Sequence, residues 1–126
     1  MALGMLNKHT TVLVVDDNPL ARATAVDLFE HLGLKVVDAY NGATALQLIA
    51  AQPEIGLLFV DVRMPGMSGP ELAEAAQRAR PQLKIVFTSG YVGRKDVPPD
   101  VPFVPKPWRV DAVAAAISGG TGSDNS

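Results

Sequence analysis

Short apolar runs alternate with segments of helical periodicity along most of this chain of 126 residues. Unbroken apolar runs rich in β-branched residues are typical of strands that are buried on both faces. They predict strands at residues 11–15, 35–39, 57–61, 83–87 and 103–104. The segments between and after them predict helices at residues 19–32, 42–52, 69–80 and 110–117. This alternation predicts right-handed crossovers and one parallel sheet that is covered by helices on both faces.

Signals for the start and the end of helices support these limits. Asn18 is a good N-cap, Pro19 suits the first helical position, and Gly33 closes the first helix. Ser68 and Glu71 match a capping box at the start of the third helix. In the first helix we expect one buried face, made of Ala21, Ala25, Leu28 and Leu32.

Polar side chains stand where several of the predicted strands end. In the doubly wound, flavodoxin-like strand order 2-1-3-4-5, the first and third strands are neighbours and a crevice forms at their carboxyl ends. Asp16 and Asp17 follow the first strand, and Asp61 ends the third. Thr88 and Lys106 follow the fourth and fifth strands on the same edge of the sheet. The sequence therefore predicts three carboxylates, a hydroxyl and an ammonium group around one crevice.

Length and composition indicate a single folded domain. Hydrophobic residues make up 48% of the chain and charged residues 19%, which excludes a disordered protein. A chain of this length buries one core and leaves no room for a second domain. We expect a flexible N-terminus at residues 1–10, the folded domain at residues 11–117 and a disordered tail, rich in Gly and Ser, at residues 118–126.

Charge and cysteine content exclude several kinds of partner. The net charge of −2 leaves no basic excess, so we expect no direct binding to nucleic acid. The absence of Cys excludes disulfides and thiolate metal sites, and it suits a reducing cytosol. No apolar stretch approaches the ~20 residues that span a membrane, so we expect a cytoplasmic protein without membrane contact.

Three carboxylates in one crevice repel one another unless they hold protons or bind a cation. Hard oxygen ligands without His or Cys nearby favour Mg²⁺, which takes one or two carboxylates and leaves another free to react. Asp61 is the best nucleophile candidate because it alone projects from the middle strand. Attack on phosphorus would give an acyl phosphate, with the Lys106 ammonium and the Thr88 hydroxyl placed to hold the phosphoryl oxygens.

Four ordered motifs resemble the receiver domain of two-component response regulators. They are the segments 14–17, 61–69, 87–91 and 104–107, which read VVDD, DVRMPGMSG, FTSGY and VPKP, and the resemblance covers residues 11–117. It implies a switch that accepts a phosphoryl group from a histidine kinase or a histidine phosphotransfer protein, acts as a monomer or weak dimer, and is not an enzyme with turnover. It is similar both to stand-alone regulators and to the receivers of hybrid histidine kinases.

The resemblance also implies a role for each site residue. Asp61 would be the phosphoacceptor, Asp17 a direct Mg²⁺ ligand, Asp16 a ligand through water, and Arg63 a ligand through its backbone carbonyl. Thr88 and Lys106 would hold the phosphoryl group, and the Lys106-Pro107 peptide would be cis. The switch residues would be Thr88, Phe103 and Tyr91.

One segment departs from the usual receiver, which has a full helix between its fourth and fifth strands. Residues 89–105 must hold two loops, a helix and a strand, whereas an average helix alone takes ~11 residues. Five residues in this connection further disfavour a helix: Gly90, Gly93, Pro98, Pro99 and Pro102. We therefore expect the fourth helix to be short or absent, with about one turn at residues 94–97.

Other readings remain open at this point. A single strand-end Asp is more often a turn former or helix cap than a nucleophile, Phe103 could equally be core, and Trp108 is expected to pack against the last helix. Two rival classes are a metal-dependent phosphatase with an aspartyl nucleophile and a pseudo-receiver that only binds partners. The former usually carries its nucleophile on the first strand, and the latter lacks at least one of the five polar site residues.

Overall fold

The computed structural model of the chain describes residues 10–90, 97 and 99–118. It contains one parallel sheet in the order β2-β1-β3-β4-β5, as predicted. The strands are β1 (Thr11–Val15), β2 (Lys35–Ala39), β3 (Ile55–Asp61), β4 (Lys84–Ser89) and β5 (Phe103–Pro105). The helices are α1 (Pro19–His31), α2 (Gly42–Ala51), α3 (Gly69–Ala79) and α4 (Val110–Ile117).

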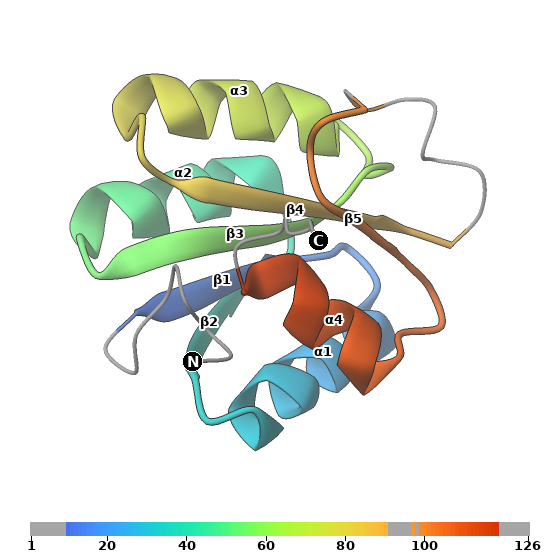
Figure 1. Cartoon of the computed structure of the whole chain (residues 1–126). Helices are drawn as coiled ribbons and strands as arrows, with labels where there is room; N and C mark the ends of the chain where they lie inside the picture. The colour runs from blue at the N-terminus through green and yellow to red at the C-terminus, as the bar shows by residue number, and fades with distance from the viewer. Residues whose placement is uncertain (1–9, 91–96, 98, 119–126) are drawn as a thin grey trace.

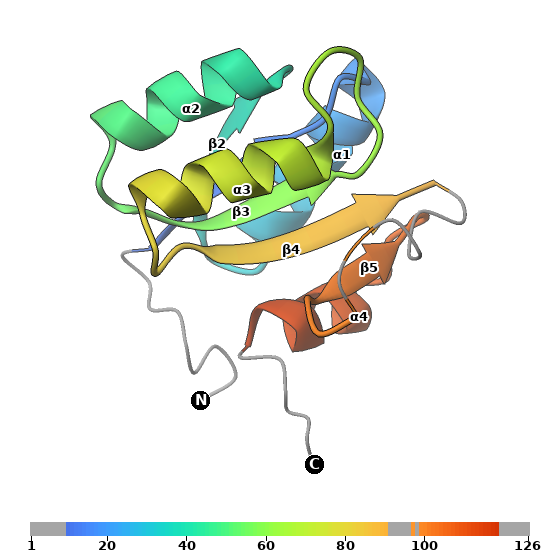
Figure 2. The same cartoon turned by 90° about the horizontal axis from the view of Figure 1, so that it is seen from above.

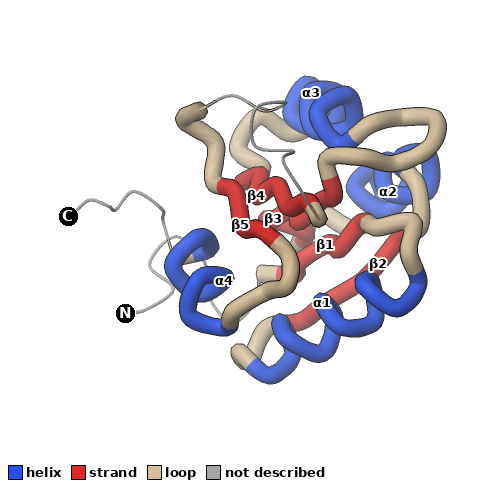
Figure 3. Tube along the Cα trace, turned by 90° about the vertical axis from the view of Figure 1, so that its right-hand side faces the viewer, coloured by secondary structure: helices blue, strands red, loops and turns tan. Residues whose placement is uncertain are grey.

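The helices cover the sheet from both sides (Figure 1). Helices α1 and α4 lie on one face, whereas α2 and α3 lie on the other, which is clearest when the strands are seen nearly end on (Figure 3). Each face has its own buried apolar cluster, and the two clusters are separated by the sheet. This confirms the doubly wound architecture predicted from the alternation of strands and helices.

The cluster between the sheet and helices α1 and α4 is built on aromatic rings. Phe29 and Phe59 are almost completely buried and meet edge to face, with ring centroids 5.0 Å apart. The predicted inner face of α1 is confirmed in part: Ala25 is buried and Leu28 and Leu32 pack against this cluster, but the buried Phe29 was not predicted. The helix is rotated so that Phe29, its largest apolar side chain, lies against the sheet.

The predicted helix caps are present. The Asn18 side chain accepts a hydrogen bond of 3.0 Å from the backbone N–H of Ala21. At the start of α3, the Ser68 hydroxyl accepts from the Glu71 N–H at 3.3 Å, and the Glu71 carboxylate accepts from the Ser68 N–H at 2.9 Å. Both helices therefore begin directly beside the strand ends that carry the aspartates.

The face of the sheet that carries α2 and α3 is covered differently near β4 and β5. In the described part of the connection, residues 90, 97 and 99–102, there is no helix between these strands, and none covers them beside α3 (Figure 2). The buried Val97 and the half-buried Val101 pack there against the apolar cluster instead. The prediction of a short or absent fourth helix is confirmed for the described residues, and α4 follows β5.

Two groups of expectations concern residues at the limits of the description. The flexible N-terminus and the disordered tail fall mainly on residues 1–9 and 119–126, which lie outside the described residues. The same holds for the turn expected at residues 94–97, apart from Val97. Within the described residues, no helix combines the length and apolar character needed to cross a membrane.

Candidate functional site

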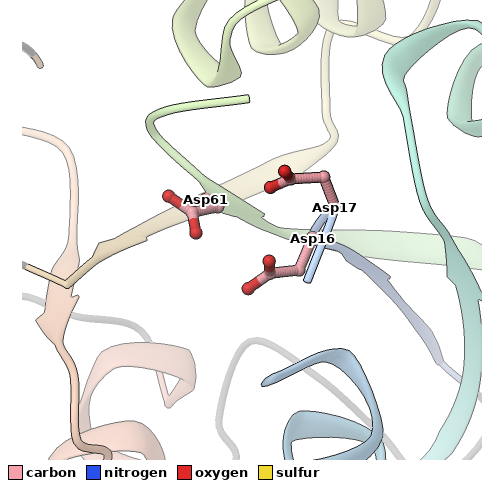
Figure 4. A group of neighbouring side chains, drawn as sticks. All are labelled: Asp16, Asp17 and Asp61. Atoms are coloured by element: carbon pink, nitrogen blue, oxygen red, sulfur yellow. The ribbon is translucent and has the colours of Figure 1, made fainter. Parts of the chain in front are cut away.

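Three aspartates meet at the carboxyl ends of β1 and β3. Asp61 is the last residue of β3, and Asp16 and Asp17 follow β1 directly. One carboxylate oxygen from each residue lies within 4.8 Å of the others, and Figure 4 shows the three side chains gathered around one space. Asp16 and Asp61 are buried, with 2% and 7% of their surfaces exposed, whereas Asp17 is exposed. The structure thus brings together the carboxylates that the sequence placed at one crevice.

Lys106 joins this group from the end of β5. Its Nζ lies 2.8 Å from Asp61 Oδ2 and 3.0 Å from Asp16 Oδ2. The backbone around it is held as well, because the Lys106 N–H donates to the Ser89 carbonyl at 3.0 Å. The Lys106-Pro107 peptide is cis, as the resemblance implied. One ammonium group therefore bridges two buried carboxylates.

Backbone N–H groups hold the other oxygens of the same two carboxylates. Asp16 Oδ1 accepts from the Asn18 N–H at 2.9 Å, and Asp61 Oδ1 accepts from the Arg63 N–H at 3.0 Å. Both contacts link residues two positions apart, so each aspartate orders the start of the loop that follows it. The carboxylates are thereby fixed in orientation before any ligand arrives.

Burial and charge act against each other in this pocket. Burial raises the pKa of the Asp61 carboxyl, and the hydrogen bonds from Lys106 and the Arg63 N–H only partly offset that rise. Burial alone would lower the pKa of Lys106, but its hydrogen bonds to Asp61 and Asp16 outweigh burial and leave it raised. Lys106 therefore stays charged, while the pocket has more carboxylate than its one ammonium can neutralise.

Thr88 lies next to Asp61 on the neighbouring strand, where the two residues are register partners of β4 and β3. Only 1% of its surface is exposed. Its backbone carbonyl accepts from the Val62 N–H at 2.9 Å, and its hydroxyl oxygen accepts from Trp108 Nε1–H at 2.7 Å. No pattern in the sequence signals this last contact, because Trp108 was expected only to pack against the last helix.

Three predicted site residues remain, namely Arg63, Phe103 and Tyr91. The Arg63 side chain is exposed, and the predicted role of its backbone carbonyl as a metal ligand stays a prediction. Phe103 is half-buried and packs against the cluster on the face of α2 and α3. Tyr91 lies outside the described residues, so its predicted role as a switch residue stays a prediction.

Comparison with known proteins identifies the family. Residues 12–99 match the family described as the response regulator receiver domain. The chain belongs to this family. The receiver domain recognised from its four motifs is thereby confirmed, together with a part in two-component signal transduction. Receiver domains are phosphoacceptor switches rather than enzymes with turnover, and they act with histidine kinases or phosphotransfer proteins.

The relatives of this receiver domain include both small regulators and large kinases. The response regulator receiver protein CpdR of Brucella abortus is 35% identical over 104 residues, which cover 79% of this chain and 85% of CpdR. The sensor kinase CckA of the same organism is 30% identical over 118 residues, which cover 89% of this chain but only 12% of CckA. The chain therefore corresponds to a small part of that kinase.

A solved structure gives the same picture of the fold. The response regulator receiver protein from Pseudomonas putida superposes on this receiver domain with a TM-score of 0.78 at 26% sequence identity. The superposition covers 90% of this chain and 99% of the other. The fold of this chain is thus that of a solved receiver structure.

Proposed function

We propose that this receiver domain accepts a phosphoryl group on Asp61 in a reaction that depends on Mg²⁺, and that the modified protein presents a changed surface to its partners. The observation that supports this most directly is the position of Asp61. It ends the central strand, lies beside Asp16 and Asp17, and is within hydrogen-bond distance of Lys106. A lone aspartate that merely forms a turn would need none of these neighbours.

The donor set of the pocket fits Mg²⁺. Its ligand atoms are carboxylate oxygens, which are hard donors of the kind that Mg²⁺ prefers. Asp17 and Asp61 would bind the ion directly, Asp16 through water, and Arg63 through its backbone carbonyl. When bound, the ion offsets the charge of the carboxylates and of the phosphoryl oxygens.

The residues of the chain supply the rest of the chemistry. A carboxylate oxygen of Asp61 forms a bond to phosphorus as the phosphorus–nitrogen bond of a donor phosphohistidine breaks, and the imidazole leaves with the bonding electrons. The Lys106 ammonium then pairs with a phosphoryl oxygen, and the Thr88 hydroxyl donates to another. Attack by water on the acyl phosphate reverses the modification.

The two rival classes fit the arrangement less well. A metal-dependent phosphatase usually carries its nucleophilic aspartate on the first strand, whereas Asp61 ends β3. A pseudo-receiver lacks part of the site, whereas this chain has three aspartates, a threonine and a lysine at the crevice. We infer that the domain takes its phosphoryl group from a histidine kinase or a phosphotransfer protein.

Partners would detect the phosphorylated state at one of two surfaces. One is the connection between β4 and β5, through Phe103 and Tyr91, and the other is the face around α1. The first follows from the absence of a helix among the described residues of that connection, because a surface that many receivers use for docking is then altered. The second follows from the position of α1 directly after Asp16 and Asp17.

Acetyl phosphate provides a direct test. With Mg²⁺ present, the intact mass of the parent protein should increase by one phosphoryl group, and hydroxylamine should remove it as expected for an acyl phosphate. Asp61→Asn should abolish the labelling, whereas Asp27→Asn, at an exposed position of α1, should leave it unchanged. If Asp61→Asn is labelled as strongly as the parent, Asp61 is not the phosphoacceptor.

A further inference from the structure

Trp108 contacts both side chains that would hold a phosphoryl group. Its indole Nε1 lies 2.7 Å from the Thr88 hydroxyl oxygen, and the Lys106 Nζ lies 5.6 Å from the centre of its ring. The indole is itself held from the core, because it meets the buried ring of Phe59 edge to face at 5.5 Å. A side chain that served only to pack α4 would not need a hydrogen bond at the end of β4.

The chemistry of the two partners decides what their hydrogen bond can do. A hydroxyl has one hydrogen and two lone pairs, whereas an indole N–H can only donate. Trp108 therefore occupies a lone pair of Thr88 and cannot take its hydrogen. Accepting one hydrogen bond also makes a hydroxyl a better donor in the next.

We propose that Trp108 is a positioning residue for phosphoryl transfer, which rests on the proposed role of Asp61. Its N–H fixes the Thr88 hydroxyl so that the hydroxyl hydrogen remains available to a phosphoryl oxygen on Asp61. Because the hydroxyl is buried and already oriented, little ordering is left for the moment of transfer. The ring against Lys106 restrains the second group that holds the phosphoryl oxygens.

The contact can be tested without Mg²⁺ or phosphate. Trp108 is the one tryptophan of the chain, so the ¹⁵N-labelled protein gives a single indole N–H signal. Thr88→Val removes the acceptor and should shift this signal and speed its exchange with water, whereas Thr88→Ser should preserve both properties. An indole signal that is the same in Thr88→Val and in the parent would overturn the proposal.

The effect on phosphorylation is tested with Trp108→Phe, which keeps a ring against Phe59 but lacks the N–H. Labelling by acetyl phosphate should be about three- to tenfold slower than in the parent, which corresponds to the loss of one hydrogen bond. In a Thr88→Val background the same substitution should cause no further loss, because the hydroxyl that the indole N–H positions is already gone and Phe keeps a ring at this place. Equal losses in both backgrounds, or labelling at the parent rate, would overturn the proposal.

Two outcomes need separate treatment: a parent protein that is not labelled, and a Trp108→Phe variant that does not fold. If the parent itself is not labelled on Asp61, the proposed function fails, whereas a labelled parent with an equally fast Trp108→Phe variant contradicts only the role of Trp108. If Trp108→Phe does not fold, Trp108 can be replaced by benzothienylalanine, which keeps the shape of the indole and lacks only the N–H. The rate of labelling should then fall as predicted for Trp108→Phe, and an unchanged rate would overturn the proposal.

Discussion

The two faces of the sheet are built in different ways. On the face of α1 and α4, the rings of Phe29, Phe59 and Trp108 form a continuous aromatic row that ends at the Thr88 hydroxyl. On the face of α2 and α3, the described residues of the β4–β5 connection contain no helix. There a groove of about 440 Å³ runs beside α3, lined by residues such as Ala73, Leu83, Phe87 and Val101.

The two faces of the sheet therefore support different parts of the molecule. The aromatic row restrains Thr88 and Lys106, so it supports the residues that would hold the phosphoryl group. On the opposite face, the described residues of the β4–β5 connection form no helix, and Val97 and Val101 pack against the apolar cluster there. The proposed phosphoryl-holding residues are thus supported from the side of α1 and α4.

Replacing one buried phenylalanine on each face tests this separation with the same chemical change. Phe29→Ala and Phe87→Ala should each lower the free energy of unfolding by about 3–5 kcal/mol, because both rings are almost completely buried. Only Phe29→Ala should shift the emission of Trp108, since the two rings share the Phe59 contact. Chemical denaturation and fluorescence measure the two effects, and an equal shift in both variants would contradict the separation.

Gly69 is the first residue of α3 and lies against the backbone of Asp61 and Val62. A methyl group at this position would overlap the carbonyl oxygen of Asp61 and the Cα of Val62, which are backbone atoms that cannot rotate away. Gly69→Ala should therefore destabilise the protein by about 2 kcal/mol or more and slow labelling of Asp61. Gly90→Ala is the matched control, because a methyl group there meets nothing within 4 Å. Thermal melts of the two variants measure the loss of stability, and labelling by acetyl phosphate measures the effect on Asp61. Equal stability of Gly69→Ala and Gly90→Ala would contradict the predicted overlap.

Most of the architecture could be predicted because the signals are local. The apolar runs gave the strands within one or two residues, and Asn18 and Ser68 cap the helices as expected. The meeting of Asp16 with Asp61 followed from strand order alone, since the carboxyl ends of parallel strands share one edge. Their roles stay predictions, but the positions did not require the structure.

The features that escaped prediction depend on how whole elements are oriented. The burial of Phe29 depends on the rotation of α1 about its axis, which a period of 3.6 residues leaves uncertain by one position. The contact between Trp108 and Thr88 joins positions 20 apart that meet only once α4 is placed. Thr88 belongs to one of the four motifs but Trp108 belongs to none, so no local pattern marks their contact.

Removing one negative charge from the carboxylate crevice should have a smaller effect, and it should change metal binding and stability in opposite directions. In Asp17→Asn, one of three charges that lie within 4.8 Å is removed, so the variant without Mg²⁺ should melt at or above the temperature of the parent. At a Mg²⁺ concentration ten times the Kd, the parent should gain ~1.4 kcal/mol, and most of this gain should be lost in the variant. Asp27→Asn serves as the control, and equal Mg²⁺ stabilisation of Asp17→Asn and the parent would contradict the assignment.

The smallest expected effect concerns Lys84, whose pKa is shifted in the opposite direction to that of Lys106. Partners raise the pKa of Lys106 despite burial, whereas burial lowers the pKa of Lys84, which lines the groove beside Glu74 and Asp100. Between its lowered folded-state pKa and the ordinary value of 10.5, Lys84 binds fewer protons in the folded protein than in the unfolded chain. Stability from this group therefore rises with pH across that window.

Lys84→Met removes this contribution. The variant should be slightly more stable than the parent at neutral pH, where the half-buried ammonium is charged, and the difference should shrink as the pH rises towards 10.5. Urea denaturation of both proteins at a series of alkaline pH values measures the difference directly, and groups that titrate alike in the two proteins cancel. A difference that stays constant with pH would mean that the gain comes from apolar packing in the groove and not from the charge of Lys84.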